Sequence, residues 1–170
     1  MMFNGIVYNQ GLIKSIKKNP KYVQGSLVIE VSSNISFKKT DIGESVSCDG
    51  VCLTLIRIKK NSFLFYLSKE TLNRSNFKYK KVGKFINIEK PLFHGKKISG
   101  HYIQGHVDTT STVKNIKIID RSWYVIFSLE NKYKKFVVEK GSISINGVSL
   151  TVSKVRSNYF QITISLTHLN

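Results

Sequence analysis

Two turns of similar sequence carry the side chains best suited to chemistry. The first, D-G-V-C-L-T, places Cys52 two residues after Gly50, and the second, N-G-V-S-L-T, places Ser149 two residues after Gly147. An Asx-Gly pair between strand-forming residues predicts a hairpin. Backbone groups beside such a turn can bind the edge of a heteroaromatic ring, and a threonine can add a hydroxyl. Each turn alone could merely reverse the chain, with Cys52 and Ser149 as small packing residues, but their recurrence favours a repeated ligand pocket.

The segment G-H-Y-I-Q-G-H-V contains two further candidate groups, His101 and His106. Their separation fits neither one face of a strand nor one face of a helix. No Asp, Glu or Cys lies nearby at the spacing of metal ligands, so we expect no metal site. A base, a ligand contact and a hydrogen-bonded structural histidine remain open interpretations. His94 and His168 are interpreted as incidental.

The composition limits the classes of protein to which the chain can belong. Of its 170 residues, 41% are hydrophobic, which is enough for a packed core and excludes wholesale disorder. No apolar run reaches the roughly 18 residues of a membrane span, and the N-terminus lacks the pattern of a secretory signal. Two cysteines are too few for a disulfide framework. We therefore expect a soluble cytoplasmic protein with free thiols.

The charge is strongly positive, with 27 Lys and Arg against 10 Asp and Glu. Such an excess is typical of nucleic-acid binders. The lysines are, however, scattered from Lys14 to Lys154, which favours a solvated basic surface. Segments 76–85 and 130–136 interleave lysine with aromatic residues, as some strand-based nucleic-acid binders do. We interpret both instead as half-buried strands with a lysine-rich solvent face.

The periodicity is that of short strands bounded by turns. A short helical turn is predicted after Ser68, which could cap it. Several strands at regular spacing indicate a barrel or a sandwich. The strands are expected at 26–31, 45–58, 62–67, 84–89, 123–129, 142–152 and 159–166.

An internal repeat organises these elements. SVSCDGVCLT (45–54) matches SISINGVSLT (142–151) at a shift of 97 positions, and FNGIV (3–7) resembles IQGHV (103–107) at a shift of 100. We interpret the chain as two copies of one β unit, residues 1–100 and 101–170. Copy one continues through FKYKKVGKFINIEK, which has no counterpart before Asn170. The second copy is therefore expected to lack its closing strand.

The motifs FNGIV, GESVSCDGVCLTL, FYLSKETL, KVGKFINIE, GHYIQGHVD and GSISINGVSLTV, in this order, strongly resemble riboflavin synthase of the α-chain type. The resemblance implies an all-β fold of two tandem six-stranded Greek-key barrels, the second here without its last strand and without the C-terminal helix. It implies that each barrel binds one 6,7-dimethyl-8-ribityllumazine, without metal or added cofactor. The implied reaction is a dismutation to riboflavin and 5-amino-6-(D-ribitylamino)uracil, the last step of riboflavin biosynthesis. The implied assembly is a homotrimer, with lumazine synthase as a further candidate partner.

The resemblance also implies roles for individual residues. The reaction needs a group that takes a proton from the C7 methyl of one lumazine and a nucleophile that adds at C7 of the other. Catalytic groups are implied at Ser45, Cys52, His106, Asn146 and Ser149. Substrate contacts are implied at Gly5, Ile6, Val7, Cys52, Leu53, Thr54, Tyr66, Leu67, Ser68, Lys69, Glu70, Thr71, Gly105, His106, Val107, Lys140, Ser149, Leu150, Thr151, Ile164, Ser165, Leu166, Thr167, His168 and Leu169.

The sequence departs from the family's pattern at two related positions. Asn146 stands where the family usually has Asp, and Asp49 stands where Asn is usual. An amide cannot serve as the same base. We therefore expect ligand binding with weak or no turnover. Because the C-terminal helix that the resemblance implies for trimer assembly is missing from this sequence, we also expect a monomer or a non-trimeric assembly. The alternatives are a non-catalytic binder of lumazine or flavin, similar to lumazine protein, and a basic β-barrel that binds nucleic acid.

Overall fold

A computed structural model describes residues 2–18, 24–93 and 95–165. Contacts within the chain group these residues into two compact units. The first unit comprises residues 1–110 together with 144–148, and the second comprises 111–143 and 149–170. The division of the repeat at residue 100 remains a prediction.

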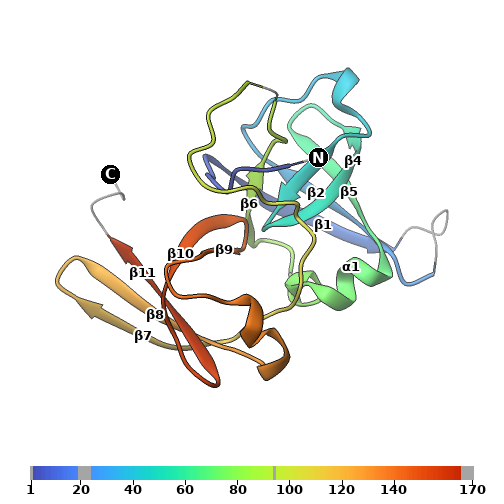
Figure 1. Cartoon of the computed structure of the whole chain (residues 1–170). Coiled ribbons are helices and arrows are strands. Elements are labelled where there is room, and N and C mark those ends of the chain that lie inside the picture. The colour runs from blue at the N-terminus through green and yellow to red at the C-terminus, as the bar shows by residue number, and fades with distance from the viewer. Residues whose placement is uncertain (1, 19–23, 94, 166–170) are drawn as a thin grey trace. The chain divides into compact units, whose positions relative to one another are not determined.

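The first unit contains a closed barrel of six antiparallel strands in the order β1–β2–β5–β4–β3–β6 (Figure 1). Closure leaves no open edge in this sheet. Its interior is filled by side chains such as Ile13, Ile29, Leu55, Phe65 and Ile88, which are at most 1% exposed. The strands are β1 Asn9–Lys18, β2 Leu27–Ser32, β3 Ser45–Cys48, β4 Val51–Ile58, β5 Ser62–Leu67 and β6 Phe85–Glu89.

Short helices connect some of the strands. The predicted helical turn is confirmed as α1, Lys69–Arg74, which follows β5 and is shown in green in Figure 1. Ser68 caps it, because its side chain accepts a hydrogen bond from the backbone nitrogen of Thr71. The 3-10 turns are η1 Lys39–Asp41, η2 Asn76–Tyr79 and η3 Asn131–Phe136.

The second unit contains an antiparallel sheet with the order β7–β8–β11–β10–β9. In the described part of the chain this sheet has five strands, so the all-β fold with a closed six-stranded barrel and a second sheet is confirmed. Phe127 and Phe160 stack in it with ring centroids 5.2 Å apart. The strands are β7 Val113–Ile119, β8 Ser122–Ser128, β9 Ser142–Ile145, β10 Val148–Val155 and β11 Tyr159–Ser165.

The repeat is visible in the irregularities of the strands. The register between β4 and β5 shifts from Leu55 to Arg57, and the register between β10 and β11 shifts from Val152 to Lys154, 97 positions later. The register also shifts within β1 and, 100 positions later, within β7. Bulges at matched positions bend the two sheets in the same places. The two copies therefore share their local geometry as well as their sequence motifs.

The interpretation of segments 76–85 and 130–136 as half-buried strands is wrong. Residues 76–79 form η2 and residues 131–136 form η3, whereas β6 begins only at Phe85. In these segments lysines instead make cation–π contacts with the aromatic residue that follows them. The ammonium of Lys78 lies 4.9 Å from the ring centre of Tyr79, and the ammonium of Lys135 lies 5.0 Å from the ring centre of Phe136.

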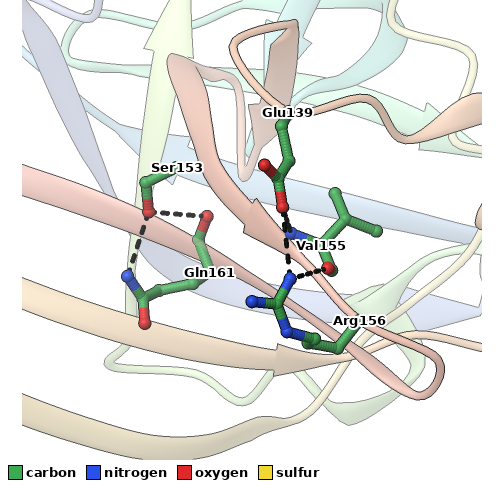
Figure 2. Close-up of polar contacts among 5 residues, drawn as sticks. All are labelled: Glu139, Ser153, Val155, Arg156 and Gln161. Atoms are coloured by element: carbon green, nitrogen blue, oxygen red, sulfur yellow. Dashed lines mark hydrogen bonds and ion pairs between the residues drawn. The ribbon is translucent and has the colours of Figure 1, made fainter.

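Polar contacts fix the loop that precedes β9 to strand β10 (Figure 2). A carboxylate oxygen of Glu139 accepts a 2.8 Å hydrogen bond from the backbone nitrogen of Val155 and faces the guanidinium of Arg156 at 3.4 Å. At the adjacent bulge, Ser153 and Gln161 exchange hydrogen bonds of 3.1 Å. These contacts hold the turn that contains Lys140, the residue after Glu139.

Candidate functional site

The first unit contains a pocket of about 280 Å³. It is built from the start of β4, from α1 and its C-terminal flank, and from the extended segment 105–107. The volume is at the small end of the range for small-molecule sites. The pocket is lined by Val51, Cys52, Glu70, Thr71, Arg74, Ser75, Gly105, His106 and Val107.

The hairpin of β3 and β4 presents Cys52 to this pocket. Asp49 and Gly50 both have positive φ, 47° and 79°, which is the conformation of a two-residue hairpin turn. Beyond the turn the strand alternates, so Leu53 lies in the core at 2% exposure while Cys52 is partly exposed on the other face. The thiol is thus on the wall of the pocket and not inside the barrel.

Segment 103–107 reaches the same pocket through main-chain hydrogen bonds. Phe3 and Ile103 exchange backbone hydrogen bonds of 2.7 and 3.0 Å, and the amide of Cys52 donates to the carbonyl of Gly105 over 2.8 Å. Gly105 has φ +77°, and a Cβ there would lie 2.8 Å from the Cβ of Cys52. Only glycine allows this approach, which brings His106 and Cys52 to one pocket.

Helix α1 supplies the third wall. Its N-cap Ser68 has its hydroxyl 2.9 Å from that of Thr71, which lines the pocket. Glu70 and Arg74, one turn apart, form an exposed ion pair at the same wall. The pocket therefore combines apolar surface with a thiol, an imidazole, a hydroxyl and one pair of opposite charges.

Two titratable residues that contact the N-terminal segment have altered pKa values. Burial raises the pKa of Glu89, against the lowering effect of hydrogen bonds from the backbone nitrogens of Asn4, at 2.7 Å, and Gly5, at 3.0 Å. Burial lowers the pKa of His101, which favours its neutral form. Glu89 thus holds the N-terminal segment that pairs with Ile103.

Six of the residues predicted from the resemblance line this pocket: Cys52, Glu70, Thr71, Gly105, His106 and Val107. Ser45 pairs with Thr54 across β3 and β4. Leu53 and Leu67 are in the core, Ser68 is the helix cap, and Lys69 is exposed. Gly5 is held by Glu89 through its backbone nitrogen. The remaining predicted residues of this unit, Ile6, Val7 and Tyr66, are partly buried.

Three residues that the sequence did not predict, Val51, Arg74 and Ser75, also line the pocket. The sequence could have predicted Arg74, because it follows Glu70 by four residues on the predicted helical turn and therefore lies on the same face. Val51 precedes the predicted residue Cys52, and Ser75 follows the predicted residue Thr71 by four positions, beyond the end of α1.

Apart from Gly105, His106, Val107 and Asn146, the predicted residues of the second copy that the structure describes lie along β10, β11 and the loop before β9. Lys140 has φ +66°. Ser149 and Leu150 are partly buried near the start of β10, and Thr151 is exposed. Ile164 is partly buried and Ser165 is exposed at the end of β11. Leu166, Thr167, His168 and Leu169 lie outside the described residues.

Asn146 occupies the second hairpin turn with φ +49°, and Gly147 follows with φ +82°. Both values match those of Asp49 and Gly50. Cys52 and Ser149 therefore follow equivalent turns at equivalent positions. The side-chain oxygen of Asn146 accepts a 3.3 Å hydrogen bond from Asn76.

Metal-binding clusters and membrane-spanning helices are both absent from the described residues. These residues contain no group of three or more His, Cys, Asp or Glu side chains that could hold a metal ion. Within the same ranges, no helix is long and apolar enough to cross a membrane.

Comparison with known proteins gives a consistent result. The lumazine binding domain family matches residues 4–91 and 104–169. Riboflavin synthase of Photobacterium phosphoreum is 36% identical over 166 residues, which cover 96% of this chain and 73% of that protein. The chain belongs to the riboflavin synthase family. Riboflavin synthase of Escherichia coli K12 is 33% identical over 160 residues, covering 94% of this chain and 74% of that protein.

Solved structures share the family's fold. The structure of LumP complexed with riboflavin has a TM-score of 0.82 and 23% identity, covering 98% of this chain and 88% of that one. The structure of LumP complexed with 6,7-dimethyl-8-(1'-D-ribityl) lumazine has a TM-score of 0.78 and 24% identity, covering 96% and 87%. At this identity the likeness concerns the fold.

Proposed function

We propose that the chain binds 6,7-dimethyl-8-ribityllumazine and acts as a riboflavin synthase, a transferase that needs no added cofactor. One lumazine gives a four-carbon unit to another, and the products are riboflavin and 5-amino-6-(D-ribitylamino)uracil. All atoms come from the two substrates, so no oxidant or reductant is required. The observation that carries the proposal is that one pocket contains Cys52 and His106 in a chain 36% identical to a riboflavin synthase.

The pocket offers the side-chain types that this chemistry needs. The imidazole of His106 is suited to moving the proton of the C7 methyl group, and the thiol of Cys52 is suited to adding at C7 of the second lumazine. Thr71 offers a hydroxyl for hydrogen bonding to the polar edge or the side chain of the ligand. Holding two rings in reactive geometry supplies much of the remaining lowering of the barrier.

A second ligand site is proposed on the second copy, with Lys140, Ser149, Leu150, Thr151, Ile164 and Ser165 as its contacts. Its support is the matched hairpin and bulge geometry of the two copies. Catalysis by Ser45, Asn146 and Ser149, association with lumazine synthase and a cytoplasmic location are parts of the same proposal.

The test is incubation of the protein with 6,7-dimethyl-8-ribityllumazine while the absorbance of riboflavin is followed. We expect saturable binding and riboflavin formation that falls strongly in Cys52→Ala and His106→Ala. A matched control is Ser157→Ala, an exposed residue between β10 and β11. Binding without riboflavin formation would instead identify a non-catalytic lumazine binder, and the absence of binding by folded protein would overturn the proposal.

A further inference from the structure

The first hairpin turn carries Asp49 where the second carries Asn146, and the surroundings of the Asp49 carboxylate are unusual for a turn. The side chain of Asp49 is only 4% exposed. Its Oδ1 accepts a 2.8 Å hydrogen bond from the backbone nitrogen of Asn87, and its Oδ2 forms an ion pair with Lys80. The side chain of Lys80 is 18% exposed. Both charges are therefore largely removed from water.

The pair lies at the seam where the barrel closes. Strands β3 and β6 pair only through Ser47 with Glu89 and Cys48 with Ile88. Asp49 leaves the strand conformation, but its backbone nitrogen still donates to the carbonyl of Asn87 over 2.8 Å. The carboxylate accepts the return hydrogen bond that a strand carbonyl would otherwise accept. Asp49 thus extends a short seam by one further pair of hydrogen bonds.

Asn87 connects this seam to the tip of the second hairpin, residues 144–148, which belongs to the same compact unit. Its side-chain nitrogen donates to the carbonyl of Asn146 over 2.9 Å. The two glycines of the turns face each other so closely that a Cβ on Gly50 would lie 2.6 Å from the nitrogen of Gly147. The position of both tips therefore depends on the same strand residue.

The burial of the Asp49–Lys80 ion pair determines how substitutions at these two positions act and what Asp49 can do. When one partner is removed, the other charge stays buried without a counter-charge, which strongly destabilises the folded protein. Removing both charges together can leave the stability nearly unchanged. A carboxylate that accepts a hydrogen bond from a backbone nitrogen and forms an ion pair with an ammonium is fixed in place and is not available to move a substrate proton. Asp49 therefore fits an anchor better than a base.

We propose that Asp49 and Lys80 form a positioning pair that fixes the tip of the β3–β4 hairpin, so that Cys52 and Gly105 keep the contact on which the pocket depends. This inference rests on the proposed function for its ligand, but not for its structural part. Cys52 lies three residues beyond Asp49 on the same hairpin, and its amide donates to Gly105. A shift of the tip moves one wall of the pocket against the other.

The test compares Asp49→Asn, Lys80→Met and the double variant, each at a temperature where circular dichroism shows it folded. We expect each single change to weaken lumazine binding by about tenfold or more, and the double variant to regain most of the affinity. The reason is that an asparagine at position 49 keeps an oxygen for the amide of Asn87, while a methionine at position 80 leaves no charge unpaired. Lys132→Met is the control, because it removes an exposed ion pair, with Glu130, whose side chains are 65% and 57% exposed.

Hydrogen exchange at the amides of Asn87 and Cys52 gives a readout that needs no ligand. Both single variants should exchange faster there, and the double variant should return toward the unmodified protein. If the unmodified protein does not bind lumazine, the proposed function fails, while the exchange pattern still decides the positioning pair. Equal exchange in all variants, or a double variant no better than the singles, would overturn the inference. So would an Asp49→Asn protein whose kcat collapses while its KM is unchanged, since that outcome identifies a base.

Discussion

The amide nitrogen of Cys52 donates to the carbonyl oxygen of Gly105 over 2.8 Å, although the repeat predicts that these residues belong to different copies. The N-terminal segment supports this contact, because Phe3 and Ile103 exchange backbone hydrogen bonds two residues before Gly105. The beginning of the second copy thus packs within the first compact unit. As a result, residues from both copies line one pocket.

Gly105→Ala should remove most ligand binding from this pocket. A Cβ at this position meets the Cβ of Cys52 at 2.8 Å and its nitrogen at 2.9 Å, both of them parts of a strand that cannot move aside. Fluorescence titration with lumazine measures the loss. Gly83→Ala is the matched control, since Gly83 has a similar φ of +83° but open space where the Cβ would lie. Equal effects of the two changes would mean that backbone strain, and not the contact with Cys52, governs binding.

Lys140→Gly should retain or raise stability while it weakens ligand binding. Lys140 has φ +66°, a conformation that costs a non-glycine residue about 1 kcal/mol or more. The equivalent position in the first copy is Gly43, with φ +96°, and both residues donate from the backbone to the next hairpin strand, Gly43 to Leu55 and Lys140 to Val152. Strain of this kind is often kept where a side chain has a function.

Thermal melting and lumazine titration of Lys140→Gly together check this prediction. A melting temperature that rises by a few degrees with lower affinity supports a ligand contact by the lysine. Unchanged affinity would remove Lys140 from the predicted contacts. Gly43→Lys is the reverse control, and it should lower the melting temperature.

Ser68→Ala should destabilise α1 by about 1 kcal/mol, because the backbone nitrogen of Thr71 loses its acceptor. Since α1 carries Glu70, Thr71 and Arg74 to the pocket, lumazine affinity should fall as well. Urea unfolding and ligand titration measure the two effects. Ser68→Asp should restore both, because aspartate is a good N-cap. A failure of Ser68→Asp to restore affinity would show that the serine hydroxyl itself contacts the ligand.

The hairpins of the fold could be predicted from sequence because their local signals agree. Asp49-Gly50 and Asn146-Gly147 demand positive φ at both positions, and the flanking residues favour strands. Strands β1 and β7 were not predicted. Their sequences, NQGLIKSIKK and VKNIKII, mix lysine into the apolar positions, and β7 is exposed along its whole length. Their strand conformation comes from pairing with β2, β6 and β8, which no local pattern records.

The candidate site was predictable only in part, for a similar reason. The resemblance supplied Cys52 and His106, but the sequence placed His106 in the second copy and gave no sign that it meets Cys52 in the first unit. His106 and Cys52 are brought to one pocket by two hydrogen-bonded contacts between backbone groups. A pattern of side chains does not predict contacts of that kind. The sequence likewise does not distinguish Lys80 from the other scattered lysines. Only the structure shows that it is largely buried beside Asp49.

Glu89→Gln should change the dependence of stability on pH. Burial raises the pKa of Glu89 above its usual value near 4.5 in the folded protein. The folded state therefore binds the proton more tightly than the unfolded state. This contribution is fully present below the unfolded-state pKa and is lost as pH rises through the folded-state pKa. The melting temperature of Glu89→Gln, relative to the unmodified protein, should therefore rise as the pH increases above about 4.5.

Glu30→Gln should show the opposite sign and so serves as the comparison. The pKa of Glu30 is lowered, first by the hydrogen bond from Lys59 at 2.6 Å and then by that from Ser62 at 2.7 Å. Its stabilising contribution is present above the unfolded-state pKa and is lost as pH falls through the folded-state pKa. The unmodified protein should therefore lose its advantage over Glu30→Gln as pH falls below about 4.5. Because this pair is partly exposed to solvent, with side chains 46% and 22% exposed for Lys59 and Glu30, the effect should be small and should shrink further in high salt. If the difference in melting temperature from the unmodified protein changed with pH in the same way for both variants, both assignments would be contradicted. Folding favours the protonated form of Glu89 but the charged form of Glu30.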